Sequence, residues 1–164
     1  MTASRSQEEF LQHPAEFELE HFLPYRLSLL TNTISQGIAN SYRREHDISV
    51  TEWRVMAVLG RYAGLTASEV VERTAMDKVA ISRAVKSLVL KGLLERRTDK
   101  GDRRRRRLFI SRNQGQKVLE KIVPLAQKYE QLLLRSLTAE QLQTTDKVMS
   151  ILLESARKMG VKRN

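Results

Sequence analysis

The sequence lacks cysteine and is poor in residues that interrupt regular structure, with seven glycines and three prolines among 164 residues. Without cysteine the chain has no disulfide, no thiolate nucleophile and no zinc site that uses sulfur. The three histidines, His13, His21 and His46, show no metal-ligand spacing. We therefore expect no thiol redox sensing, no metal and no other cofactor.

Long apolar runs are also missing. No stretch approaches the roughly eighteen apolar residues of a membrane span, and the start of the chain lacks the apolar stretch of a signal peptide. We therefore expect a cytoplasmic protein without membrane contact. Clustered His and carboxylate groups and a phosphate-binding glycine loop are absent as well. We expect no catalytic residues, and an enzyme is the weaker alternative.

The excess of basic residues is concentrated in one segment. The chain has 29 Lys and Arg against 19 Asp and Glu, and residues 73–107 alone hold thirteen basic and four acidic residues. The opening stretch is acidic instead. A solvated surface ordinarily mixes both signs, so this concentration favours a phosphate-binding face. A sequence-neutral nucleoid-type or RNA-binding protein is the alternative to a sequence-specific one.

Hydrophobic periodicity predicts long helices at both ends of the chain. Apolar residues recur at intervals of three and four over 18–45, over 113–137 and after the capping box at 138–141. These helices have too little partner surface within one chain. We therefore expect a homodimer built from the first, fifth and sixth helices, with a monomeric helical bundle as the alternative.

Between the long helices, a helix over 51–63 is followed by two short ones. Thr66 and Glu69 fit a capping box that begins a helix to about Thr74. Asp77 begins the next helix, and Gly92 ends it. One face of this helix is basic and polar, and the other holds Ile81, Ala84, Val85 and Leu88. A helix of this kind after a tight turn is what a helix-turn-helix places in the major groove.

A basic hairpin follows this helix. Residues 93–97 and 107–111 predict two short strands, and 99–102 predict the turn. The tip of the hairpin holds the run of arginines that begins at 103. From this position arginine can enter a narrow minor groove. The prediction is a mainly α, winged helix-turn-helix fold with six helices and a two-stranded β-wing. A solvated loop or a localisation signal is the alternative for the arginine run.

From Leu19 to the C-terminus the sequence resembles the MarR family of winged-helix transcription regulators. The segments that carry the resemblance are 79–85 with Leu88, 92–96 and the wing residues 99–104. The resemblance implies six helices, a two-stranded wing, an obligate dimer and repression that a small anionic or aromatic effector relieves. The Asp-x-Arg wing signature of the family corresponds to Asp102 and Arg104, which implies that the acid holds the tip while an arginine enters the minor groove.

The residues expected to contact DNA are polar or cationic and lie on the two short helices and the wing. They are Lys78, Ser82, Arg83 and Lys86 for the major groove, Thr66 and Ser68 for phosphate, and Asp102, Arg103, Arg104 and Arg105 for the wing. Two departures from the family pattern affect individual base contacts and not the fold. Ala80 stands where members often have Ser or Thr, and 111–113 replaces the common Leu-Thr-x-x-Gly.

Effector binding is implied by the resemblance, because ligands of the family often lie between the dimer helices and the winged domain. Aromatic walls and cations suited to a carboxylate occur on the first two helices, at His21, Tyr25, Arg26, Trp53 and Arg54. We expect an aromatic carboxylate or its thioester, since 22–27 and 52–54 resemble family members that control aromatic-compound catabolism. The alternative places Trp53 in the core and Arg26 and Arg54 in surface salt bridges.

The expected domain organisation follows from these segments. It comprises an acidic N-terminal extension (1–17), a first dimerisation helix (18–46), a winged helix-turn-helix DNA-binding domain (47–112) and C-terminal dimerisation helices (113–164). Two-fold symmetry would present two recognition helices to a pseudo-palindromic operator. We expect a homodimeric repressor that leaves its double-stranded DNA operator when the effector binds.

Overall fold

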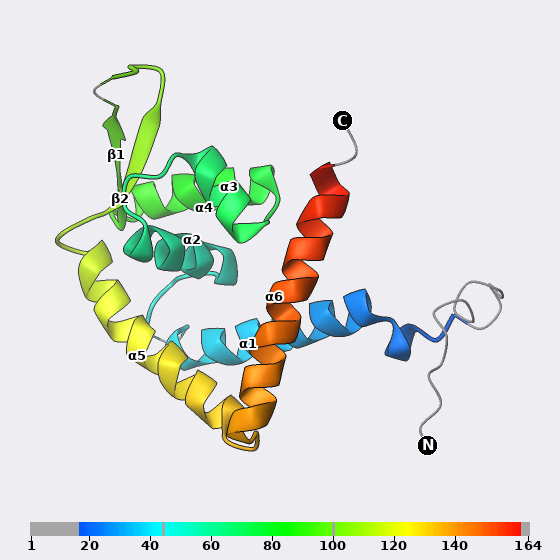
Figure 1. Ribbon diagram of the computed structural model, residues 1–164. Coiled ribbons are helices and arrows are strands. Elements are labelled where there is room, and N and C mark those ends of the chain that lie inside the picture. Colours follow the sequence, from blue (N-terminus) through cyan, green and yellow to red (C-terminus); the bar gives the residue numbers. More distant parts are fainter. Residues whose placement is uncertain (1–16, 44, 100, 162–164) are drawn as a thin grey trace, which may run out of the picture. The chain divides into compact units, whose positions relative to one another are not determined.

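The computed structural model describes residues 17–43, 45–99 and 101–161 (Figure 1). They form two compact units, one ending at Val50 and the other beginning at Thr51, and each is described by itself. Of the acidic extension expected over 1–17, residues 1–16 lie outside the described residues.

A long helix makes up most of the first unit. A 3-10 turn, η3 (Leu19–His21), precedes α1 (Leu23–Tyr42). The helix predicted over 18–45 is therefore too long at both ends. Pro24 in the first turn of α1 explains the late start, because proline has no N–H and is tolerated only where a helix N–H has no partner within the helix.

The second unit holds the remaining helices and the hairpin. Its elements are α2 (Val50–Arg61), which begins at the last residue of the first unit, α3 (Ala67–Thr74), α4 (Lys78–Leu90), β1 (Leu94–Thr98), β2 (Arg106–Ile110), α5 (Gly115–Leu134) and α6 (Ala139–Val161). Figure 1 shows α3 and α4 beside the hairpin, α5 leading away from it and α6 turning back. With α1, the described residues form six α-helices and a two-stranded antiparallel sheet, so the predicted winged helix-turn-helix fold is confirmed.

The core of the second unit takes residues from α2, α3, α4, both strands and α5. Helix α4 packs against α3 and β1, and α3 contacts β2. The face of α4 that was predicted to be apolar is buried, as the helical period requires. The buried apolar residues are Val55, Met56, Leu59, Val70, Ile81, Ala84, Val85, Leu88, Leu93, Leu94, Leu108, Leu119 and Ile122.

Gly92 ends α4, as predicted, and begins a junction at the base of the hairpin. Its φ of 67° lies in the left-handed region that favours glycine, and the N–H of Leu93 donates to the carbonyl of Leu88 at 2.9 Å. The buried Ser111 hydroxyl donates to the Gly92 carbonyl (2.6 Å) and accepts from the Gly115 N–H (2.8 Å). The end of α4 is thereby tied to the start of α5.

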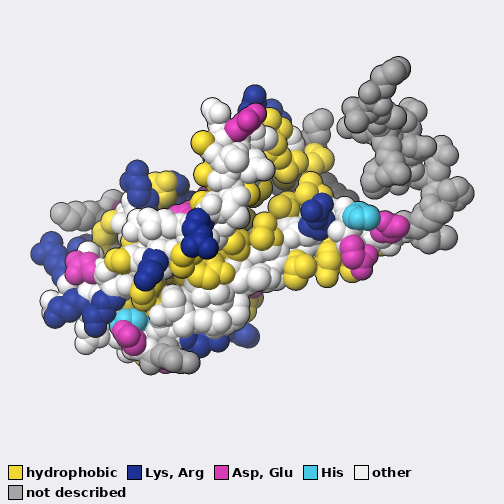
Figure 2. Space-filling model, turned by 90° about the horizontal axis from the view of Figure 1, so that it is seen from below, with side chains coloured by type: hydrophobic (Ala, Val, Ile, Leu, Met, Phe, Trp, Pro, Cys, Tyr) yellow, Lys and Arg dark blue, Asp and Glu magenta, His cyan; other side chains and the backbone are white. Residues whose placement is uncertain are grey.

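Apolar side chains are exposed along α1, α5 and α6. Leu29 and Leu30 of α1 are 54% and 52% exposed, and Leu132 of α5 is 57% exposed. On α6 the exposed apolar residues are Val148, Met149, Ile151, Leu153 and Met159. Figure 2 shows hydrophobic side chains in yellow on one face of the molecule. Extended apolar surface of this kind is typical of protein–protein interfaces.

Candidate nucleic-acid interface

Helices α3 and α4 form a helix-turn-helix whose ends are set by local caps. The Glu69 carboxylate accepts from the Thr66 N–H (2.7 Å), and the Glu69 N–H donates to the Thr66 hydroxyl (3.3 Å), which confirms the predicted capping box. Ala75, with a φ of 51°, ends α3. The Asp77 carboxylate then accepts two backbone N–H groups from the first turn of α4. These caps fix the direction in which α4 leaves the turn.

The outer face of α4 carries the four side chains predicted to enter the major groove. These side chains are those of Lys78, Ser82, Arg83 and Lys86. All four are exposed, and none has a side-chain partner within the described part of the chain. The opposite face of the helix is buried in the core. The donors of the outer face are therefore available to base edges and phosphates.

Thr66 and Ser68, the predicted phosphate contacts, differ in their surroundings. The Thr66 hydroxyl donates to the Glu69 carboxylate at 2.9 Å, so this donor is already in use. Ser68 is exposed, and its hydroxyl has no partner among the residues that the structure describes. Glu69 also places a negative charge at the start of α3, where it competes with a phosphate. Ser68 is thus the better placed of the two.

The wing is held against the loop between α2 and α3. Strands β1 and β2 pair antiparallel along their whole length. The N–H of Leu108 donates to the Leu65 carbonyl (2.8 Å), and the Leu108 carbonyl accepts from the Gly64 N–H (2.9 Å). The Arg107 guanidinium adds a bond to the Gly64 carbonyl (2.9 Å). The base of the wing is therefore rigidly attached beside the helix-turn-helix.

Asp99 organises the tip of the wing, although the family signature does not include it. One carboxylate oxygen accepts from the N–H groups of Gly101 (2.8 Å) and Asp102 (3.0 Å), and the other accepts from the Arg107 guanidinium. Asp102 contributes less, because among the described residues its carboxylate accepts only the Arg104 N–H (2.9 Å). An Asp that precedes a Gly in a predicted turn is the signal that could have identified Asp99.

The consecutive arginines of the wing have different surroundings. Arg103 and Arg104 are exposed at the tip and have no side-chain partner in the described ranges. Arg105 forms an ion pair with Glu69 of α3 at 3.6 Å, and the next two arginines bond within the wing. Arg103 and Arg104 can therefore reach a minor groove directly, whereas Arg105 must first leave Glu69. Lys100 of the turn lies outside the described residues.

The charge of Asp99 stabilises the tip over a wide pH range. The Arg107 guanidinium, and then the two backbone N–H groups, lower the pKa of Asp99 from 3.8 to about 2. The ionised carboxylate stabilises the wing fully above pH 3.8, and its contribution is lost as the pH falls through about 2.

Asp99→Asn removes this charge at every pH, so we expect faster amide hydrogen exchange across the wing and weaker DNA binding. Asp102→Asn is the control, and equal effects of the two variants would contradict the role of Asp99.

Glu69 restrains Arg105, so removing its charge should strengthen DNA binding. Hydrogen bonds from Thr66, and then the charges of Arg105 and Arg107, lower the pKa of Glu69, so it is ionised at neutral pH. Glu69→Gln keeps a residue that completes a capping box but loses the ion pair. Because an exposed pair contributes about 0.2–1 kcal/mol, we expect DNA affinity to rise by up to about fivefold at low salt.

The matched control for Glu69→Gln is Glu72→Gln, on an exposed residue of α3 that has no partner in the described part of the chain. It removes the same charge without releasing Arg105. Titration of labelled DNA measures both variants. Equal gains in affinity would show that the ion pair does not restrain the wing.

The residues predicted for effector binding lie in both units. His21, Tyr25 and Arg26 belong to the first unit and are exposed. Trp53 and Arg54, on α2, belong to the second unit and are half-buried. Their assembly into one site stays a prediction.

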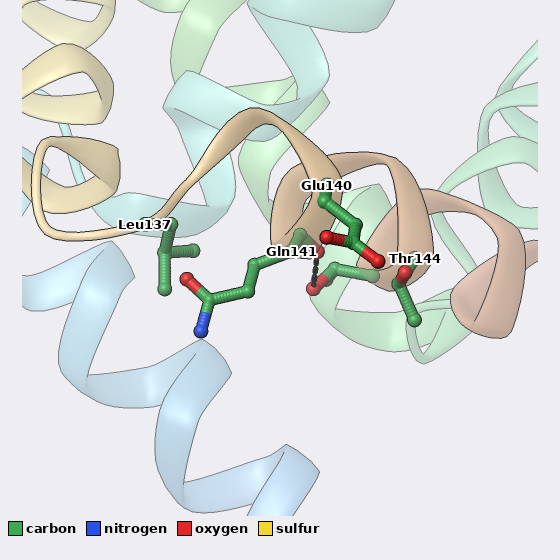
Figure 3. A pocket seen from close by; sticks show the side chains of 5 residues that line it. Leu137, Glu140, Gln141 and Thr144 are labelled. Carbon is green, nitrogen blue, oxygen red and sulfur yellow. Dashed lines mark hydrogen bonds between the residues drawn. The ribbon is translucent and has the colours of Figure 1, made fainter.

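A hollow of about 400 Å³ lies at the start of α6 and includes none of these five residues (Figure 3). It is lined by Leu137, Glu140, Gln141, Thr144 and Thr145. The Thr145 hydroxyl donates to the Gln141 carbonyl at 2.8 Å. The Gln141 N–H donates to the Thr138 hydroxyl (3.2 Å) and the Gln141 side chain accepts from the Thr138 N–H (2.9 Å), so the second predicted capping box is confirmed. These lining residues are neither aromatic nor cationic and do not match the chemistry expected for the effector site.

The described residues contain no group of three His, Asp or Glu that could hold a metal ion. None of the helices within residues 17–43, 45–99 and 101–161 is long and apolar enough to cross a membrane.

The helix-turn-helix and the wing are similar to known proteins. Residues 46–105, from before α2 to the wing, match the model of the MarR family. Among solved structures, a MarR/EmrR family transcriptional regulator from Acinetobacter sp. ADP1 superposes with a TM-score of 0.79 at 21% identity, over 86% of this chain and 99% of that chain. A MarR family transcriptional regulator from Silicibacter pomeroyi DSS has a TM-score of 0.73 at 27% identity, over 87% and 95% of the two chains. A MarR transcriptional regulator from Methanosarcina mazei Go1 has a TM-score of 0.74 at 22% identity, over 84% and 98%. No curated protein matches the sequence.

Proposed function

We propose that this chain is a winged-helix transcription regulator of the MarR family that acts as a homodimeric repressor of a pseudo-palindromic DNA operator. In this proposal the DNA-binding domain spans 47–112, and 18–46 and 113–164 form the dimer. A small aromatic or anionic effector releases the repressor from DNA.

The observation that carries DNA binding is a set of cations on two adjoining elements that have no partner among the described residues. The outer face of α4 presents Arg83 among its donors, and the wing presents Arg103 and Arg104. Because the Arg105–Glu69 ion pair joins the wing to α3, the wing lies beside the helix-turn-helix. A recognition helix can then read the major groove while the wing reaches the neighbouring minor groove.

The exposed apolar residues of α1, α5 and α6 support a dimer. Side chains such as Leu30, Leu132 and Ile151 are more than half exposed, although the sequence places them on apolar helical stripes. A second copy that covers these stripes would remove apolar surface from water. Two-fold symmetry then sets two recognition helices about 34 Å apart, which is one turn of DNA.

Selection of bound DNA fragments from a genomic library, near physiological salt, tests the proposed function. We expect a pseudo-palindromic motif whose binding weakens in the Arg104→Ala variant. Arg112→Ala, which removes an exposed cation after β2, is the control and should leave the motif bound. Binding without a motif would favour the alternative, a sequence-neutral nucleoid-type or RNA-binding protein.

The effector part of the proposal has its own test. We propose that an aromatic carboxylate or its thioester binds near His21, Tyr25, Arg26, Trp53 and Arg54, which supply aromatic walls and cations. The ligand must favour the dimer form that does not fit DNA, because a ligand shifts an equilibrium only by its differential affinity. Candidate acids are titrated while Trp53 fluorescence and operator affinity are followed. Binding of the acids without any change in operator affinity would contradict this part.

A further inference from the structure

Val79 is an apolar residue on the otherwise polar outer face of α4. Its side chain is 55% exposed, whereas the apolar residues of the opposite face, such as Ile81 and Val85, are buried. Ser82, Arg83 and Lys86 follow it at intervals of three, four and seven, so all four lie on one stripe of the helix. The stripe assigned to the major groove therefore carries a hydrophobic group among its hydrogen-bond donors.

The position of Val79 is fixed by local structure. It is the second residue of α4, and its N–H donates to the Asp77 carboxylate at 2.8 Å. A β-branched side chain in a helix has one strongly preferred rotamer, so its two methyl groups are held in place before any contact forms. Residues in this first part of a recognition helix are the ones that contact base edges.

The base edges of the major groove offer one apolar group in unmodified DNA, the C5-methyl group of thymine. We infer that Val79 contacts this methyl group in each half-site of the operator and so selects thymine at one position. The inference deepens the DNA-binding function proposed above and rests on it. Arg83, one turn further along α4, then donates to the neighbouring base or contacts the neighbouring phosphate.

Leu90 provides a matched control on the same stripe. It lies eleven residues after Val79, at the end of α4, and is 79% exposed. Eleven residues correspond to about 16 Å along the helix axis, which moves Leu90 away from the base edges that the first turn contacts. Leu90→Ala removes more apolar surface than Val79→Ala, and we expect it to leave the base preference unchanged.

The test replaces each thymine of the selected motif in turn by deoxyuridine, which removes the methyl group and keeps the hydrogen-bonding pattern. For the unchanged protein we expect one symmetric position at which the replacement weakens binding, by about fourfold for one half-site and about fifteenfold for both. Val79→Ala should bind the thymine and deoxyuridine duplexes equally at that position. Leu90→Ala should keep the full difference.

The outcomes separate this inference from the proposed function. If no motif is selected, both fail together. If a motif is selected but Val79→Ala remains as sensitive to deoxyuridine as the unchanged protein, only the role of Val79 is overturned. A loss of sensitivity in Leu90→Ala as well would overturn it too, because the effect would then not belong to the first turn of α4. Far-ultraviolet circular dichroism of each variant confirms that it is folded.

Discussion

Gly115→Ala should destabilise the protein by about 3 kcal/mol or more, because no space exists for a side chain at this position. A Cβ atom there would lie 2.2 Å from the Leu93 carbonyl oxygen and 2.9 Å from a side-chain carbon of Ile110. The Leu93 carbonyl cannot move away freely, since it accepts from the Ser111 N–H at 3.0 Å. Ser111 in turn bonds Gly115 and the end of α4. Relief of the clash would therefore disrupt the whole junction.

Gly160→Ala is the matched control for this prediction. Gly160 lies near the end of α6, and nothing within 4 Å would meet an added Cβ. Both substitutions reduce the freedom of the unfolded chain alike, so their difference isolates the clash. We expect Gly160→Ala to leave stability unchanged or to raise it by up to about 1 kcal/mol. Thermal unfolding at one protein concentration measures both, and equal melting temperatures would show that the junction can rearrange.

DNA binding should weaken about 10³- to 10⁵-fold between 50 and 200 mM salt, as expected for six to ten phosphate contacts. On the outer face of α4 and at the tip of the wing, the cations without partners in the described ranges are Lys78, Arg83, Lys86, Arg103 and Arg104. Five in each copy amount to about ten in a dimer, and each neutralised phosphate contributes about −0.9 to the slope of log affinity against log salt. A complex that is insensitive to salt would contradict the interface.

The assignment of single cations is tested by the same slope. In a dimer, Arg104→Ala removes two phosphate or groove contacts, so the slope should become less steep by about 1.8 if each arginine neutralises one phosphate. Lys121→Gln removes an exposed cation from α5, outside the interface, and should leave the slope unchanged. A similar change in both variants would indicate a nonspecific effect of net charge.

The order and type of the elements could be predicted from the sequence because the signals that set them are local. Asp77 and the Thr66–Glu69 box act within one helical turn, and Gly92 stops α4 by its own backbone conformation. The buried face of α4 likewise follows from the helical period alone. The predicted bounds are less exact: the first helix is shorter than predicted at both ends, and at its start Pro24 outweighs the apolar periodicity around it.

Tertiary structure decided which arginines of the wing form ion pairs and which do not. Five successive arginines are equivalent in the sequence, yet Arg105 meets Glu69 and Arg107 meets Asp99, while Arg103 and Arg104 remain unpaired in the described part of the chain. These ion pairs form only when the hairpin closes and lies beside α3, so no local sequence pattern predicts them. The requirement for glycine at position 115 has the same origin, because the Leu93 carbonyl approaches it from a segment 22 residues earlier in the chain. Composition and periodicity thus determined the fold and the basic face, and contacts between distant segments decided which of its cations are free for DNA.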